Sequence, residues 1–266
     1  PNVEPLYTVA DAMRVPEFLQ TCEYHQTVDV CEGVKATFID AGHLLGSASI
    51  LMELTEGGEK RNIVFSGDIG NVDQPIIRDP QFFGGADYVV MESTYGNRNH
   101  TEVWSYTDDL AQIIDETLGR GGNVVIPSFA VGRTQELLYF IREIKDRHLV
   151  TSVQDFPVYV DSPLAKSATR IFCGDLRGYL DEEALALVQD GTHMFSFPGL
   201  HLTESVEESK LLNMDGTPKV IISASGMCDA GRIRHHLKYN LWRADSAVVF
   251  VGFQSPGTLG RTLLDG

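Results

Sequence analysis

Short apolar segments alternate with helix-like segments over most of the chain after Thr101, and this alternation restricts the possible folds more than any other feature. The strand-like segments are 123–126, 158–160, 220–222 and 247–251. The helix-like segments are 108–118, the residues after Arg133, 164–172 and 232–241. Such alternation predicts a parallel or mostly parallel sheet with helices on both faces. Ligands of such sheets bind at the carboxyl ends of the strands.

The first hundred residues have a different pattern. A helix is expected near the start, because Thr8 and Asp11 have capping-box spacing, and Pro16 should end or kink it. Strands are expected at 34–38, 49–54, 62–65 and 88–91, with no long helical pattern between them. The chain is therefore predicted to be α/β with two domains, 1–100 and 101–266. The acidic stretch from about residue 176 to 215 is expected to form helical excursions over the surface.

Three short strings in the first domain each place a metal-binding side chain beside glycine at a strand end. They are Asp-Ala-Gly-His-Leu-Leu-Gly-Ser at 40–47, Phe-Ser-Gly-Asp-Ile-Gly at 65–70 and Met-Glu-Ser-Thr-Tyr-Gly at 91–96. Glycine lets the backbone turn and approach closely, so the side chains of His43, Asp68 and Glu92 can converge. The alternatives are a hydrogen-bonded core histidine, an aspartate that caps a turn, and a glutamate that caps through Ser93 or Thr94.

Polar residues also follow the strands of the second domain. Ser225 and Gly226 stand between a strand and a helix, where backbone amides and a hydroxyl can meet a phosphate. Ser128 and Arg133 flank a second such turn, and Arg133 could make a bidentate phosphate contact. Arg261, beside the Gly257-Thr258 turn, is a third candidate. Serine and glycine at such turns often serve only backbone geometry, and Tyr95 suits either base stacking or core packing.

The formal net charge is −16, which argues against a surface that binds any polyanion. Arg232, Arg234, Lys238 and Arg243 nevertheless fall in one segment with His235 and His236 and without an acid. That segment fits either a local positive groove or a solvated helix face.

The four cysteines show no CxxC pairing, which favours a reducing cytoplasm. The apolar runs are far too short to span a membrane.

Several strings occur in a fixed order along the chain: Asp-Ala-Gly-His, Phe-Ser-Gly-Asp, Pro-Ser-Phe-Ala-x-Gly-Arg-x-Gln-Glu at 127–136, Ser-Gly-Met at 225–227 and Gly-Thr-Leu-Gly-Arg at 257–261. This ordered series resembles the β-CASP branch of the metallo-β-lactamase fold. These are RNA-processing nucleases related to the cleavage factor for messenger-RNA 3′ ends. The resemblance implies a partial metallo-β-lactamase αββα layer with an inserted β-CASP αβα cassette, and a centre of two zinc ions.

By this resemblance, His43 matches a histidine ligand, Asp68 the carboxylate that bridges the two metals, and Glu92 a residue that orients a ligand histidine. Asp68 and Glu92 are thus the expected catalytic carboxylates, and His43 and Asp68 the expected metal ligands. The family's His-x-His-x-Asp-His cluster and two later histidine motifs are not in the sequence, and would precede Pro1 and follow Gly266. Taken alone, this polypeptide is expected to hold zinc weakly or not at all and to be inactive.

The function expected for the parent protein is zinc-dependent hydrolysis of phosphodiester bonds in single-stranded RNA. Two alternatives stay open: a non-catalytic RNA-binding subunit of a processing complex, and a small-molecule metallo-hydrolase. The presence of both Asp68 and Glu92 favours the enzyme over the first, and the large cassette disfavours the second. No membrane association is expected, and the resemblance makes a homodimer a reasonable expectation. The sequence does not distinguish endonuclease from exonuclease action.

Overall fold

The computed structural model describes residues 5–97, 106–174, 176 and 178–266, and it divides into two compact units. Unit 1 comprises residues 1–71 with 80–93, and unit 2 comprises residues 72–79 with 94–266. The domain boundary expected between residues 100 and 101 lies outside the described residues. Both units contain a β-sheet, and helices accompany both, so the expected α/β class is confirmed.

Unit 1 begins with α1 (Val9–Arg14) and a 3-10 turn, η1 (Val15–Phe18). The Thr8 hydroxyl accepts a hydrogen bond from the Asp11 amide, and the Asp11 carboxylate accepts one from the Thr8 amide at 2.9 Å. The predicted capping box is therefore confirmed. Pro16 lies in η1, just past the end of the α-helix, because its ring is incompatible with a continuing helix interior.

The sheet of unit 1 follows chain order, β1-β2-β3-β4-β5. Its strands are β1 (Thr27–Cys31), β2 (Val34–Asp40), β3 (Ala48–Glu56), β4 (Glu59–Phe65) and β5 (Tyr88–Val90). All pairs are antiparallel except β4 with β5. Four of these strands are predicted from the sequence. β1 is not, because most of its residues are exposed and its composition is that of a polar edge strand.

The sheet of unit 2 is parallel throughout, in the order β10-β6-β9-β7-β8. Its strands are β6 (Val124–Pro127), β7 (Val158–Asp161), β8 (Leu200–Leu202), β9 (Val220–Ser223) and β10 (Ala247–Val248). The predicted parallel sheet is confirmed. β10 is shorter than the apolar run 247–251, and β8 is an additional strand within the stretch that was expected to be helical.

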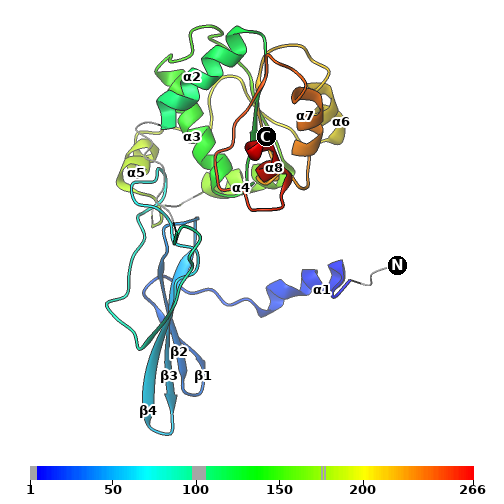
Figure 1. Cartoon of the computed structure of the whole chain (residues 1–266). Helices are drawn as coiled ribbons and strands as arrows, with labels where there is room; N and C mark the ends of the chain where they lie inside the picture. The colour runs from blue at the N-terminus through cyan, green and yellow to red at the C-terminus, as the bar shows by residue number, and fades with distance from the viewer. Residues whose placement is uncertain (1–4, 98–105, 175, 177) are drawn as a thin grey trace. The chain divides into compact units, whose positions relative to one another are not determined.

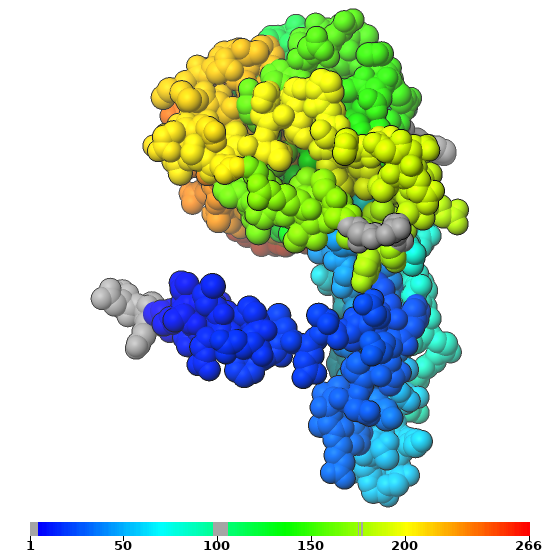
Figure 2. Space-filling view, turned by 180° about the vertical axis from the view of Figure 1, so that it is seen from behind, coloured from blue at the N-terminus to red at the C-terminus, as the bar shows by residue number. Residues whose placement is uncertain are grey.

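The helices of unit 2 are α2 (Tyr106–Gly119), α3 (Arg133–Asp146), α4 (Pro163–Phe172), α5 (Glu182–Gln189), α6 (Val206–Leu212), α7 (Ile233–Asn240) and α8 (Leu259–Asp265). Figure 1 shows α2 and α3 on one side of the strands and α6 and α7 on the other. The segment carrying α4, α5 and α6 forms much of the surface seen in Figure 2.

The core of unit 2 lies where this sheet meets its helices. Val124, Val125 and Ile126 of β6 have no exposed surface, and neither do Leu138 and Ile141 of α3. A strand covered on both faces reads as a continuous apolar run, which is why the central strands are predictable from the sequence. In the register of the sheet, Pro127 and Asp161 both lie opposite Ser223, so the carboxyl ends of β6, β9 and β7 share one edge.

Candidate metal and RNA-binding sites

His43 and Asp68 come together in unit 1. His43 follows β2 and Asp68 follows β4, and their Nε2 and Oδ2 atoms lie 4.0 Å apart. Both side chains reach solvent, with 41% of the His43 side chain and 76% of the Asp68 side chain exposed. The two donor atoms are therefore accessible and close enough to reach one ion.

Glycine brings the two loops into contact. The Gly70 amide donates a hydrogen bond to the Ala41 carbonyl at 2.8 Å. A Cβ at Gly70 would lie only 1.6 Å from the Gly42 carbonyl oxygen and 2.8 Å from the His43 nitrogen. Only glycine permits this approach, and the approach places the His43 loop against the residues that follow Asp68.

Two polar side chains shape the His43 loop from within. The buried Asp40 carboxylate accepts a hydrogen bond from the Gly42 amide at 2.8 Å. The Ser47 hydroxyl accepts bonds from the His43 and Leu44 amides, both at 3.1 Å. Neither residue has a role predicted from the sequence, although an aspartate two residues before a glycine is a known turn signal.

Glu92 supports the Asp68 loop. Its Oε1 atom accepts a hydrogen bond from the Ile69 amide at 3.0 Å, and its own amide donates to the Ser66 hydroxyl at 3.0 Å. The contact observed for Glu92 is thus with the backbone directly after Asp68. The orientation of a ligand histidine by Glu92, which the resemblance implies, stays a prediction.

An imidazole and a carboxylate are donors that zinc accepts, so the chemistry of His43 and Asp68 fits the metal that the resemblance implies. Among residues 5–97, 106–174, 176 and 178–266, however, no group of three or more histidine, cysteine, aspartate or glutamate side chains could hold an ion. These two donors alone are therefore too few for a zinc site, since such a site uses three or four protein ligands.

The turn between β6 and α3 carries Ser128 and Arg133. The Ser128 side chain is buried and lies 3.1 Å from the Thr134 hydroxyl, so it shapes the turn. This position does not favour the predicted phosphate contact of Ser128. Arg133 Nη1 lies 2.6 Å from Glu136 Oε2, and 37% of the arginine side chain stays exposed. Burial raises the pKa of Glu136, and the positive charge of Arg133 opposes that rise.

The turn between β9 and α7 packs against the first one. A Cβ at Gly226 would lie 3.0 Å from the Phe129 ring, and Gln254 Nε2 donates to the Gly226 carbonyl at 3.0 Å. The Ser225 amide donates to the Ala230 carbonyl at 3.2 Å, and the Ser225 hydroxyl accepts a hydrogen bond from the Ala230 amide at 3.4 Å. The residues predicted at these two strand ends therefore lie at one edge of the parallel sheet.

Arg261 lines a hollow of about 580 Å³. The residues around it are Tyr95, Phe253, Pro256, Gly257, Arg261, Thr262 and Asp265. Tyr95 meets Phe253 edge to face, with ring centroids 6.2 Å apart. The Arg261 guanidinium is paired with Asp265, at 2.9 Å from Nε to Oδ2 and from Nη2 to Oδ1. The hollow therefore offers an aromatic wall and an arginine whose charge is balanced by a neighbouring carboxylate.

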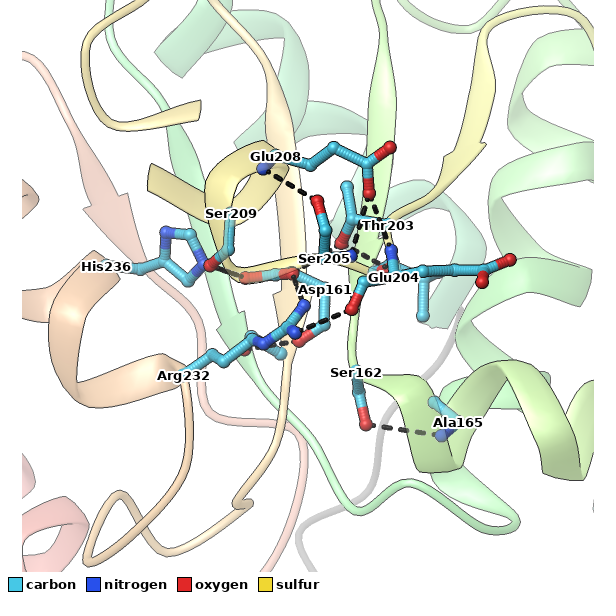
Figure 3. Close-up of polar contacts among 12 residues, drawn as sticks. Asp161, Ser162, Ala165, Thr203, Glu204, Ser205, Glu208, Ser209, Arg232 and His236 are labelled. Atoms are coloured by element: carbon cyan, nitrogen blue, oxygen red, sulfur yellow. Dashed lines mark hydrogen bonds and ion pairs between the residues drawn. The ribbon is translucent and has the colours of Figure 1, made fainter. Parts of the chain in front are cut away.

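A buried polar cluster around Asp161 was missed by the sequence analysis (Figure 3). The Asp161 carboxylate, at the end of β7, has no exposed surface. His236 Nε2 and Arg232 Nη1 each lie 2.7 Å from one of its oxygens. The Ser209 hydroxyl donates at 2.5 Å, and the Thr203 hydroxyl also donates to it. The cluster joins β7, α6 with the segment before it, and α7.

Burial alone would raise the pKa of Asp161, because the charged form loses its hydration. The hydrogen bonds from His236, Ser209, Thr203 and Arg232 outweigh burial and hold the pKa well below its usual range. Asp161 is therefore ionised at neutral pH. The signal in the sequence was an aspartate at the end of an apolar strand, combined with an arginine and a histidine one helical turn apart.

This cluster corrects the hypothesis of a positive groove formed by the whole basic segment. Arg232 and His236 point inward to Asp161, and the His236 side chain is fully buried. Arg243 pairs with Asp245, at 3.0 Å from Nε to Oδ1. Arg232 and His236 are therefore not available for a polyanion, because they are held inward by the buried Asp161 carboxylate.

No helix in the described part of the chain is long and apolar enough to cross a membrane.

Comparison with known proteins identifies the family. The Beta-Casp domain family matches residues 134–263. Ribonuclease TTHA0252 of Thermus thermophilus is 36% identical over 261 residues, which cover 98% of this chain and 58% of that protein. The RNase J-like protein of Methanocaldococcus jannaschii is 30% identical over 269 residues, or 100% of this chain and 60% of that protein.

Transcription termination factor FttA of Methanosarcina mazei is 32% identical over 249 residues, which cover 92% of this chain and 38% of that protein. The chain thus spans between 38% and 60% of the length of these three relatives. The similarity extends well beyond the Beta-Casp match, into the unit that carries His43 and Asp68. Residues 134–263 therefore belong to the Beta-Casp domain family, and the relatives support the β-CASP branch of the metallo-β-lactamase superfamily for this chain.

Proposed function

We propose that the protein containing this chain is a metal-dependent ribonuclease that hydrolyses phosphodiester bonds in single-stranded RNA. The observation that carries the proposal is the convergence of His43 Nε2 and Asp68 Oδ2 to 4.0 Å from two loops. The ribonuclease names of two relatives support it. So does the presence of the carboxylates of Asp68 and Glu92, which an RNA-binding subunit without catalysis would not need.

In this proposal, His43 and Asp68 would hold zinc as two of its ligands. Bound zinc would supply a Lewis acid and a source of hydroxide at neutral pH. Glu92 fixes the turn after Asp68 through the Ile69 amide, so it holds the Asp68 carboxylate in place. Gly70 sets the distance between the two loops. The chain's own contribution is therefore the placement of two donors and the orientation of one.

The substrate side of the proposal rests on unit 2. The edge formed by the ends of β6, β9 and β7 carries Arg133, Ser225 and Gly226, and ligands of parallel sheets bind at such edges. Single-stranded RNA fits this chemistry because its bases are free to be contacted one by one. A cytoplasmic location fits the cysteines, which are free in the described residues, and a homodimer stays an expectation.

The test compares the wild-type protein, as its gene encodes it, with Asp68→Ala. We expect cleavage of a labelled single-stranded RNA to be abolished in the presence of Zn²⁺, while the circular dichroism spectrum is unchanged. Asp29→Ala is a matched control, because Asp29 is an exposed carboxylate of the same unit, paired with Lys35 in the sheet. Unchanged turnover in Asp68→Ala would exclude Asp68 from the mechanism. RNA binding without cleavage by the wild type would favour a non-catalytic subunit.

A further inference from the structure

The helix α7 has a buried face and an exposed face. Ile233, His236, Leu237 and Asn240 are buried against the sheet and the Asp161 cluster. The opposite face consists of Arg234, His235, Lys238, Tyr239 and the following Trp242, all exposed. We call this second set the α7 face. Figure 1 shows α7 beside α6 on the outer side of the sheet of unit 2.

The α7 face is continuous because of helical spacing. Arg234 and Lys238 are four residues apart, and so are His235 and Tyr239, so each pair shares one side of the helix. Trp242 follows four residues after Lys238, just past the end of α7. Trp242 is 77% exposed and Tyr239 is 45% exposed. A tryptophan this exposed is uncommon on a protein surface without a partner.

The charges of the α7 face are not matched by acids. Arg234 and Lys238 form no ion pair with any described residue, and Arg234 Nη1 donates a hydrogen bond to the Asp229 carbonyl at 3.5 Å. Most other arginines of unit 2 are paired with carboxylates, as Arg133, Arg147 and Arg261 show. On a chain with a net charge of −16, this face is therefore a local exception.

We propose that the α7 face binds a segment of single-stranded RNA outside the strand-end turns, with Arg234 and Lys238 on phosphates and Tyr239 and Trp242 stacked on bases. Unpaired cations beside exposed aromatic rings are the combination that holds single strands. α7 begins just after the turn that carries Ser225 and Gly226, and its eight residues extend about 12 Å from there. The inference rests on the proposed function, and it gives the RNA a second region of contact.

The first experiment measures binding of a labelled single-stranded RNA to the full-length protein without added metal, so that binding is separated from cleavage. We expect Trp242→Ala to weaken binding about tenfold, because one base loses its stacking partner. Arg234→Glu with Lys238→Glu should weaken binding at least as much and reduce the slope of log affinity against log salt by about 1.4, since two phosphate contacts are lost.

Lys210→Glu is the matched control, because Lys210 is an exposed cation of the neighbouring helix α6 and changes the net charge in the same direction. We expect it to have a much smaller effect than either change on the α7 face. Equal weakening by Lys210→Glu would show that only the overall charge matters, and would overturn the proposal.

The second experiment uses Trp242 as a probe. The 266 residues contain two tryptophans, Trp104 and Trp242, so Trp104→Phe in this chain leaves Trp242 as the only tryptophan of these residues. We expect oligouridylate to quench its fluorescence, and polyglutamate of similar charge to have no effect. Quenching by polyglutamate alone would assign the face to an acidic protein partner and overturn the proposal. If the protein cleaves RNA but Trp242 fluorescence does not change, the proposal for the α7 face is also overturned. If oligouridylate quenches Trp242 but no RNA is cleaved, the α7 face proposal stands and the proposed ribonuclease activity is contradicted.

Discussion

The space beside Gly70 is already filled by backbone, so this residue controls the distance between the two donor loops. A Cβ there would overlap the Gly42 carbonyl oxygen at 1.6 Å, and neither partner is a flexible side chain. Gly70→Ala must therefore push the His43 loop away from the Asp68 loop. We expect a loss of stability of about 1–3 kcal/mol. We also expect a fall in RNA cleavage of about 100-fold if His43 moves by ~1 Å.

Gly84→Ala is the control, since no atom lies within 4 Å of the place of its Cβ. Chemical denaturation and cleavage assays on both variants check the prediction. Wild-type activity in a folded Gly70→Ala protein would show that the 4.0 Å separation of His43 and Asp68 is unimportant for function.

Asp161 makes the stability of unit 2 sensitive to low pH. Its pKa in the folded protein lies below that of an unfolded chain, which is about 3.9. The ionised carboxylate therefore contributes its full stabilisation above about pH 4, and the contribution is lost as the pH falls through the folded pKa. We expect the free energy of unfolding of the wild type to fall below pH 4, and that of Asp161→Asn to fall less steeply.

At pH 7 the same variant should be less stable by about 3–5 kcal/mol, because Arg232 and His236 lose the anion between them. Denaturant titrations at several pH values measure both effects. Asp108→Asn is the control. Asp108 is exposed and its ion pair with Arg147, at 3.4 Å, lies at the surface, so loss of this charge should change the stability little. Parallel pH profiles for the wild type and Asp161→Asn would contradict the assignment.

At the scale of elements, α3 carries the arginine that the sequence singled out. Arg133 begins the helix, and its partner Glu136 lies one turn further along at 2.6 Å. We expect Arg133→Ala to weaken RNA binding several-fold without changing metal content, and to reduce the salt slope by about 0.7, the value for one phosphate contact on a single strand. Binding assays at three salt concentrations test this.

Arg147→Ala is the matched control for α3, because Arg147 is the C-cap residue of the same helix and pairs with Glu143. It should leave binding nearly unchanged. An identical loss in both variants would mean that Arg133 acts only through general charge.

The elements that the sequence predicts well are those with a strong local signal. β6, β7 and β9 are apolar runs followed by turns, and the Thr8 capping box marks the start of α1. β1 and β8 have no such signal, because their pairing depends on a neighbouring strand, β1 is largely exposed and β8 has only three residues. The predicted length of β10 is too great, since the apolar run continues past the two residues that pair with β6.

The same distinction applies to the sites. The strings around His43 and Asp68 predict donors at strand ends, and the structure places the two side chains 4.0 Å apart. The Asp161 cluster is assembled from residues up to 75 positions apart, so no local sequence pattern predicts it. The division of α7 into a buried and an exposed face likewise depends on how the helix packs, which the charge of the segment does not reveal.

At the scale of the whole molecule, the proposed metal donors and the turns proposed to contact RNA are carried by different units of one chain. Unit 1 supplies His43, Asp68 and Glu92, and unit 2 supplies Arg133, Ser225 and the α7 face. The two chemistries can therefore be tested separately: changes in unit 1 should affect metal content and turnover, and changes in unit 2 should affect RNA affinity and its dependence on salt.

Zinc binding by the 266-residue chain is the last test of this division. His43 and Asp68 give an ion two donors, and the described residues offer no group of three, whereas tight zinc sites use three or four. We expect zinc added to the purified chain to be removed by dialysis, and His43→Ala to reduce the weak binding further. His235→Ala, which removes an exposed imidazole of α7, should have no such effect. Stoichiometric zinc after dialysis, measured by elemental analysis, would show that a third donor joins His43 and Asp68 and would contradict the view of these two residues as a partial site.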